Sequence, residues 1–189
     1  MTDNLALELT AGTPVEASLN TSATAYTFTP TSCSTNGACA MNGNTTYDNT
    51  TGKWYYSWYA ATAGTGTPAL VSADASASVC PVGWRIPANY TLAPSKSYGT
   101  LTNAYGITTS GAINNQNYTA ILEASPLSFA RSGDYSSSLV DSGASGFYWS
   151  ATAYSVSSVV YDFYYSASGA NPQDLNGKYL GFNVRCVAL

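Results

Sequence analysis

Histidine is absent from the 189-residue chain. Its absence excludes the Ser-His-Asp and Cys-His arrangements in which histidine activates a nucleophile. The sequence also has no C-x-x-C pair of the kind that holds structural zinc. We therefore expect a protein that is not an enzyme and that carries neither a metal ion nor another cofactor.

Charge is scarce as well, with six basic residues against ten acidic ones and a net charge of −4. A nucleic-acid partner is not expected, because such partners are bound through basic patches. No stretch is long and apolar enough to span a bilayer, so direct membrane insertion is not expected either. A surface kept polar by uncharged side chains is common in secreted and particle-borne proteins. We expect an extracellular, cell-surface or virion-surface location.

The four cysteines permit two disulfides in three connectivities. Cys33 and Cys39 bracket a turn-like loop that a local bridge would close, which would leave Cys80 and Cys186 for a long-range bridge. The alternative is a cytosolic protein with four free thiols. Paired cysteines in an oxidising compartment are the favoured interpretation.

Hydrophobic periodicity and turn residues indicate an α+β fold with a β-rich C-terminal half and one or two helices. Residues 1–53 form a lead-in of strand and loops, and residues 54–189 form the main domain. The expected strands are 24–30, 126–133, 147–153, 158–166 and 179–187, with a strand or short amphipathic element at 53–62. Helices are expected within 88–117 and at 118–124, and loops or turns at 33–52, 64–79, 133–134, 141–145 and 169–172.

The C-terminal stretch from Gly146 to Cys186 is rich in Tyr, Ser and Asn. These residues combine contact area and hydrogen bonding at a modest ordering cost, which is typical of recognition surfaces. An ordinary tyrosine-rich sheet is the alternative. Asp162 and Asp174 lie in separate expected elements and do not indicate paired-carboxylate catalysis. Asn171-Pro172 is interpreted as a turn rather than part of a calcium site.

Five segments in order resemble the bacterial domain family named for the major paralogous proteins of Fibrobacter succinogenes. They are WYYSWYAATAGTGT (54–67), CPVGWRIP (80–87), PLSF (126–129), FYWSAT (147–152) and GFNVRC (181–186). The resemblance implies a C-type lectin-like fold whose last strand is tied back by a disulfide between Cys80 and Cys186. Cys33 and Cys39 would then form the second disulfide.

The same framework occurs in variable proteins of diversity-generating retroelements, so the resemblance also implies a variable region at about 147–186. Adenine mutagenesis of AAY codons cannot produce Glu, Lys, Gln, Met or Trp. Between Trp149 and Arg185, only Gln173 and Lys178 depart from this restriction. By position, the implied ligand-binding residues are Tyr154, Asp162, Tyr164, Asp174, Leu175, Asn176, Gly177, Tyr179 and Leu180, with Ser155, Val156 and Asn183 as weaker candidates.

These observations predict a receptor- or adhesin-like protein that binds an unknown protein or glycan ligand through a diversified C-terminal surface. The alternative is a structural cell-surface or virion protein without a variable ligand site. Alternation along the strand at 158–166 predicts Tyr161 and Phe163 on its buried face. Asp162 and Tyr164 are then expected on the solvent face.

Overall fold

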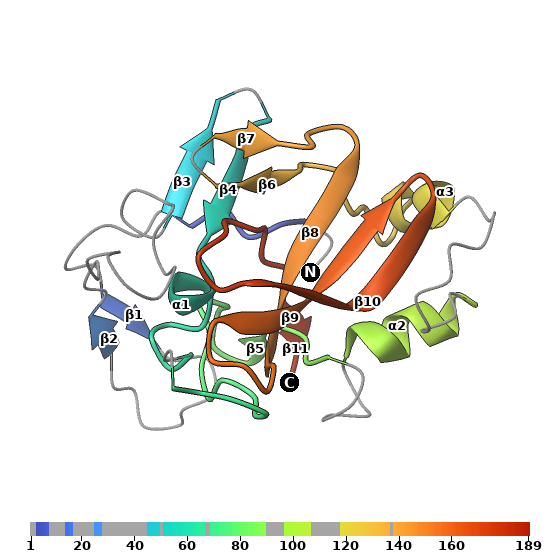
Figure 1. Cartoon of the computed structure of the whole chain (residues 1–189). Coiled ribbons are helices and arrows are strands. Elements are labelled where there is room, and N and C mark those ends of the chain that lie inside the picture. Colours follow the sequence, from blue (N-terminus) through green and yellow to red (C-terminus); the bar gives the residue numbers. More distant parts are fainter. Residues whose placement is uncertain are drawn as a thin grey trace.

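The computed structural model describes residues 3–7, 14–16, 25–27, 45–49, 51–66, 69–89, 97–106, 118–136 and 138–189. Within them, strands predominate over three short helices, as expected for an α+β protein (Figure 1). The helices are α1 (Trp58–Ala61), α2 (Tyr98–Ala104) and α3 (Tyr118–Glu123). The strands before α3 are β1 (Pro14–Glu16), β2 (Ala25–Thr27), β3 (Thr45–Asp48), β4 (Lys53–Tyr56) and β5 (Trp84–Arg85). Those after α3 are β6 (Asp134–Tyr135), β7 (Leu139–Val140), β8 (Ser145–Ala153), β9 (Val159–Ser166), β10 (Gly169–Gly177) and β11 (Val187–Ala188).

The longest strands form one antiparallel sheet in the order β10-β9-β8, so β9 is central. The pairing of β9 with β10 shifts register between Asn171 and Asp174, a stretch that contains Pro172. Within the described residues β10 is an edge strand. Proline and bulges are tolerated at sheet edges and hinder pairing with a further strand. The edge of this sheet is therefore protected against unspecific strand addition.

Buried side chains cover both faces of this sheet. On one face, Trp149 of β8 and Val160 of β9 belong to a cluster with Trp58, Phe182 and Val184. On the other face, Tyr148 and Phe163 belong to a second cluster, whose further members are Tyr98, Tyr118, Leu122, Phe129, Tyr165 and Ala170. Because adjacent strand residues point to opposite faces, one sheet supplies both clusters.

Short two-stranded pairs and capped helices surround the sheet: β1 pairs with β2, β3 with β4, β5 with β11, and β6 with β7. Ser57 follows β4 and caps the N-terminus of α1. Its hydroxyl accepts a 3.2 Å hydrogen bond from the amide of Ala60. Ser97 caps α2 in the same way through the amide of Thr100, at 3.1 Å. None of the described helices is long and apolar enough to cross a membrane.

Several sequence predictions agree with these elements. The expected helix at 118–124 is α3, and the expected strands at 147–153 and 158–166 are β8 and β9. The expected strand at 24–30 is represented by β2, and the segment 53–62 contains both a strand and a helix. The helix expected within 88–117 is represented by α2.

Other predictions are wrong. Residues 169–172 begin β10 rather than forming a turn, and β10 accommodates Pro172 at its register shift. The segment 179–187 forms a turn and isolated bridges before β11, because its main chain bonds to several different elements. The strand expected at 126–133 begins only at Asp134, so residues 133–134 do not form a turn. The expected loop at 33–52 includes β3, which pairs with β4, and the described residues hold three helices rather than one or two.

Candidate recognition surface

Of the residues predicted to form one variable surface, those on β9 and β10 divide between the two faces of these strands. Asp162 is paired directly with Asp174, so their side chains share a face. Tyr161 is paired with Leu175, one position along each strand, and these two share the opposite face. The ribbon formed by β9 and β10 therefore presents a polar face and an aromatic face.

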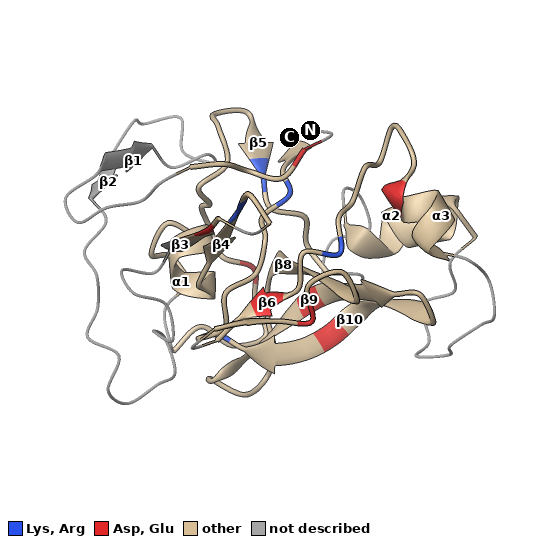
Figure 2. Ribbon diagram, turned by 90° about the horizontal axis from the view of Figure 1, so that it is seen from above, with Lys and Arg blue, Asp and Glu red and all other residues tan. Residues whose placement is uncertain are grey.

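The polar face carries a cluster of two aspartates and two asparagines, which we call the Asp–Asn cluster: Asp162, Asn171, Asp174 and Asn176. The side-chain amide of Asn176 donates to Asp162 Oδ1 at 3.1 Å and to Asp174 Oδ2 at 3.2 Å. The amide of Asn171 donates to Asp174 Oδ1 at 3.2 Å. The acidic positions on β9 and β10, with a third on β6, lie in one region of the molecule (Figure 2).

The two aspartates of the cluster differ in how deeply they are buried. Asp162 is fully buried, whereas Asp174 is half-buried at the surface. Burial and the neighbouring Asp174 carboxyl raise the pKa of Asp162 well above its ordinary value, against the opposing effect of the Asn176 hydrogen bond. Burial also raises the pKa of Asp174. The expectation that Asp162 faces solvent is wrong, because the face of β9 that carries it is covered by the first core cluster.

The aromatic face brings together Tyr154, Tyr161, Leu175 and Tyr179. The rings of Tyr154 and Tyr161 are in edge contact, with centroids 5.3 Å apart. Leu175 and Tyr179 are each 41% exposed. Gly177 shares the face of Leu175 by strand alternation, and the Tyr179 ring occupies the space that a side chain at Gly177 would need. We call these four side chains the aromatic patch, in which Leu175 and Tyr179 are exposed and Tyr154 and Tyr161 are half-buried.

The remaining candidates lie in different environments. Tyr164 is half-buried on the polar face, and its ring centroid lies 5.2 Å from that of Phe147. Leu180 packs partly against the first core cluster. Ser155 and Val156 are exposed in the connection between β8 and β9. Asn183 is fully buried and donates to the carbonyl of Trp54 at 2.8 Å, so it is unsuited to a surface site.

Lys178 anchors the turn that follows β10. Its ammonium group donates to the carbonyl of Leu70 at 3.0 Å and lies 4.8 Å from the centroid of the Trp58 ring. Burial lowers the pKa of Lys178 to about 8. The main-chain amide of Trp58 also donates to the carbonyl of Lys178. Through these contacts, Lys178 holds the turn that carries Tyr179 against α1.

The predicted disulfide between Cys80 and Cys186 is confirmed. It joins positions 106 residues apart, with their Cα atoms separated by 5.8 Å. Cys186 directly precedes β11, which pairs with β5. The bridge thus fastens the end of the chain beside the sheet. The second predicted pair, Cys33 and Cys39, lies outside the described residues.

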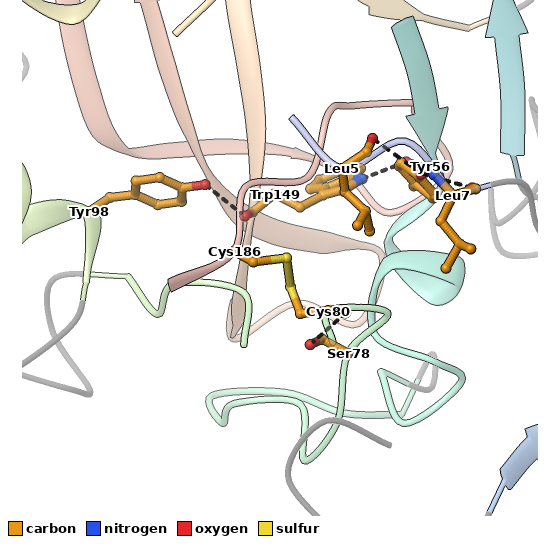
Figure 3. The surroundings of a disulfide bond; sticks show 8 residues. All are labelled: Leu5, Leu7, Tyr56, Ser78, Cys80, Tyr98, Trp149 and Cys186. Atoms are coloured by element: carbon orange, nitrogen blue, oxygen red, sulfur yellow. Dashed lines mark hydrogen bonds between the residues drawn. A yellow bond between two sulfur atoms is a disulfide. The ribbon is translucent and has the colours of Figure 1, made fainter. Parts of the chain in front are cut away.

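Trp149 lies above this disulfide, between Tyr98 and Tyr56 (Figure 3). Its carbonyl accepts from the Tyr98 hydroxyl at 3.3 Å, and its indole nitrogen donates to the carbonyl of Tyr56 at 2.6 Å. The Tyr56 hydroxyl in turn accepts a hydrogen bond of 2.7 Å from the amide of Leu7. The amide of Leu5 donates to the carbonyl of Val184. The N-terminal residues 3–7 are therefore fastened to the same core as the C-terminal segment.

Arg185 is part of this core rather than of a surface. Its guanidinium group donates to the carbonyls of Leu127 and Ser128, each at 2.8 Å. The group also lies 4.4 Å from the centroid of the Phe129 ring. These contacts attach the segment after α3 to the C-terminal segment.

The two faces of the ribbon present different chemical groups. The polar face presents carboxyl oxygens and amide groups, and the aromatic face presents tyrosine rings with an aliphatic neighbour. Among the described residues, no group of three or more Cys, Asp or Glu side chains is arranged to hold a metal ion.

Two members of the ribbon were not among the predicted binding residues. Tyr161 was assigned to the buried face, but its ring joins Tyr154 at the edge of the aromatic patch. Asn171 was assigned to a turn, but it lies on β10 opposite Tyr164. Their residue types match the rest of the Tyr- and Asn-rich stretch, and this composition was the signal available in the sequence.

Comparisons of the chain with protein-family models, with curated proteins and with solved structures give no match.

Proposed function

We propose that this chain is a ligand-binding protein that recognises a protein or glycan through the β9–β10 ribbon, without catalysing a reaction. The observation that carries the proposal is that the partly exposed aromatic patch lies on a sheet that also has side chains packed in the core. Leu175 and Tyr179 are partly exposed, while Phe163 and Trp149 of the same sheet are fully buried. Rigid elements hold binding side chains in place, and tyrosine contributes contact area at low entropic cost.

The resemblance given by the five sequence segments makes this proposal more specific. It implies a C-type lectin-like fold and a surface diversified by a retroelement. The Cys80–Cys186 disulfide and the hydrogen bond between Leu5 and Val184 are compatible with that arrangement, because both fasten the chain ends together. An extracellular, cell-surface or virion-surface location is part of the same proposal, since disulfides persist in oxidising environments.

The nucleotide sequence downstream of the coding region tests the diversification. We expect a near-copy of the segment encoding residues 149–185, with AAC codons at the positions of Tyr154, Leu175 and Tyr179. Related isolates should differ at those codons and agree at the codons of Trp149 and Phe163. Isolates that are identical throughout the segment, with no near-copy downstream, would instead favour a structural surface or virion protein.

A binding experiment tests recognition independently of the retroelement. A library randomised at Tyr154, Leu175 and Tyr179 would be displayed and selected against a panel of unrelated proteins. A matched library would be randomised at Tyr47, Val82 and Leu189, which are exposed and lie outside the ribbon. We expect specific binders from the first library only. Equal yields from both would remove the reason to assign recognition to the ribbon.

A further inference from the structure

The Asp–Asn cluster brings the two acidic groups Asp162 and Asp174 together on the polar face. Asp162 and Asp174 occupy directly opposed positions on antiparallel strands. Like charges in this arrangement destabilise a sheet, because the opposed side chains are close neighbours. The side-chain amide of Asn176 donates to both carboxyls and that of Asn171 donates to Asp174, so these groups supply hydrogen bonds but no positive charge.

The buried member of the pair has unused hydrogen-bonding capacity. Asp162 is fully buried, and its Oδ2 atom has no hydrogen-bond partner within the described part of the chain. A buried carboxyl group with an unsatisfied oxygen is costly to maintain. Within the same residues, neither Asp162 nor Asp174 belongs to an ion pair, whereas Glu123 is paired with Arg131 at 2.7 Å.

Asp174 gives this acidic site access to the surface. It is half-buried, as are its neighbours Asn171 and Asn176. Tyr164 lies on the same face, opposite Asn171 and two positions along β9 from Asp162. A partner group at Asp174 would therefore meet a carboxylate first, with a second acidic group behind it and an aromatic ring nearby.

We propose that Asp174, backed by the buried Asp162, anchors a lysine or arginine side chain of a partner protein. The inference rests on the proposed function, since it assigns a chemical class of partner to the polar face of the same ribbon. Arginine fits the site best, because its planar guanidinium group binds carboxylates through two hydrogen bonds and also packs on aromatic rings. The positive charge would offset the repulsion between the two aspartates.

A metal ion fits the same residues less well. Carboxylate and amide oxygens are the protein ligands that calcium prefers. In the Asp–Asn cluster, the hydrogen bonds turn the amide nitrogens of Asn171 and Asn176 toward the carboxyls. Donors in that orientation exclude the amide oxygens from the same space. An organic cation instead places its own hydrogen-bond donors against the exposed carboxylate.

Titration with small probes tests the anchor directly. The probes are N-acetyl-arginine amide and N-acetyl-citrulline amide, which have similar shapes but differ in charge. Side-chain amide signals of Asn171 and Asn176 would be followed by NMR. We expect saturable changes with the arginine probe, and binding about fivefold weaker with the Asp174→Asn variant. Equal responses to both probes, or unchanged arginine binding by Asp174→Asn, would overturn the proposal.

Two further variants serve as controls. Asp3→Asn removes the same charge from an exposed position near the N-terminus. Its binding of the arginine probe should equal that of the wild type. Asp162→Asn should weaken that binding while leaving the surface carboxylate in place. The indole signals of Trp149 and Trp58 report whether each variant is folded. If Asp174→Asn does not fold, the Asp162→Asn variant tests the proposal instead. Unchanged binding of the arginine probe by this variant would then overturn it.

Selection of short displayed peptides on the whole protein separates this inference from the proposed function. Peptides that require Lys or Arg, and lose binding to both Asp174→Asn and Tyr164→Ser, support both proposals. Peptides that lose binding to Tyr164→Ser but not to Asp174→Asn would overturn the cationic anchor and support recognition by the ribbon. Peptides indifferent to Tyr164→Ser, Asp174→Asn and Tyr179→Ser would contradict the proposed function.

Discussion

The indole nitrogen of Trp149 donates a hydrogen bond of 2.6 Å to the main-chain carbonyl of Tyr56, 93 residues earlier in the chain. The same indole stacks on Phe182, with ring centroids 4.1 Å apart. One side chain of β8 therefore joins β4 to the C-terminal segment. This contact belongs to the support of the β9–β10 ribbon rather than to the faces proposed for binding.

Truncation of Trp149 should consequently destabilise the protein, whereas truncation of Tyr179 should not. We expect Trp149→Ala to lower the free energy of unfolding by roughly 3–5 kcal/mol, because it leaves a cavity in the core. Tyr179→Ser should change that free energy by no more than about 0.5 kcal/mol, as is usual for partly exposed positions. Urea denaturation followed by tryptophan fluorescence measures both changes. A loss for Tyr179→Ser as large as that for Trp149→Ala would make Tyr179 a core residue.

The disulfide should contribute strongly to stability. The double variant Cys80→Ala/Cys186→Ala removes the bridge without leaving a single reactive thiol. We expect it to lose about 2–5 kcal/mol, because the bridge restricts a long loop in the unfolded chain. Thermal unfolding under non-reducing conditions measures the loss. An unchanged melting temperature would show that the remaining contacts of Val184 and Phe182 suffice to hold the C-terminal segment.

The Asp162–Asp174 pair should make stability fall as the pH rises. The pKa values of both carboxyls are raised in the folded state, chiefly by burial. Above the unfolded value of about 4, the folded state thus holds more protons than the unfolded state, and the free energy of unfolding decreases with pH. The contribution is fully present below about pH 4 and is lost as the pH rises through the raised values.

Asp162→Asn should flatten this dependence, because an amide does not ionise. The other groups that act on Asp162 are Asp174 on β10 and Asp134 on β6, and Tyr98 on α2 is affected by the Asp162 charge. Melting temperatures measured between about pH 4 and pH 8 give the slope for each protein. Asp3→Asn is the matched control and should keep the wild-type slope. An equal slope for Asp162→Asn and the wild type would disprove this assignment.

Gly133 and Gly143 allow a test of backbone and steric effects. Both adopt positive φ, of +74° and +78°. A Cβ atom at Gly133 would collide with the carbonyl oxygen of Val140, whereas one at Gly143 would meet no atom within 4 Å. We expect Gly143→Ala to cost about 1–2 kcal/mol from the backbone conformation alone. Gly133→Ala should cost clearly more, as measured by chemical denaturation. Equal losses would mean that the β6–β7 pair shifts to accept the methyl group.

The sequence by itself determined the α+β class and the positions of β8 and β9, but not that of β10. Alternation of apolar residues over 147–153 and 158–166 predicted β8 and β9, and the apolar pattern before Pro126 predicted α3. The motif resemblance predicted the pairing of Cys80 with Cys186. These features depend on local patterns or on segments that can be recognised one at a time, so they can be predicted from the sequence alone.

The division of the proposed binding residues between the two faces of the ribbon was decided only by the tertiary structure. Alternation assigns Asp162 and Phe163 to opposite faces of β9, but it does not say which face is covered. The answer depends on distant segments, since Phe182 and Trp58 cover one face and Tyr98 and Phe129 cover the other. Pro172 favoured a turn in the sequence because it lacks an amide donor, yet a register shift at the edge of the sheet accommodates it. Asp162 and Asp174 became neighbours only because β10 continues past that proline.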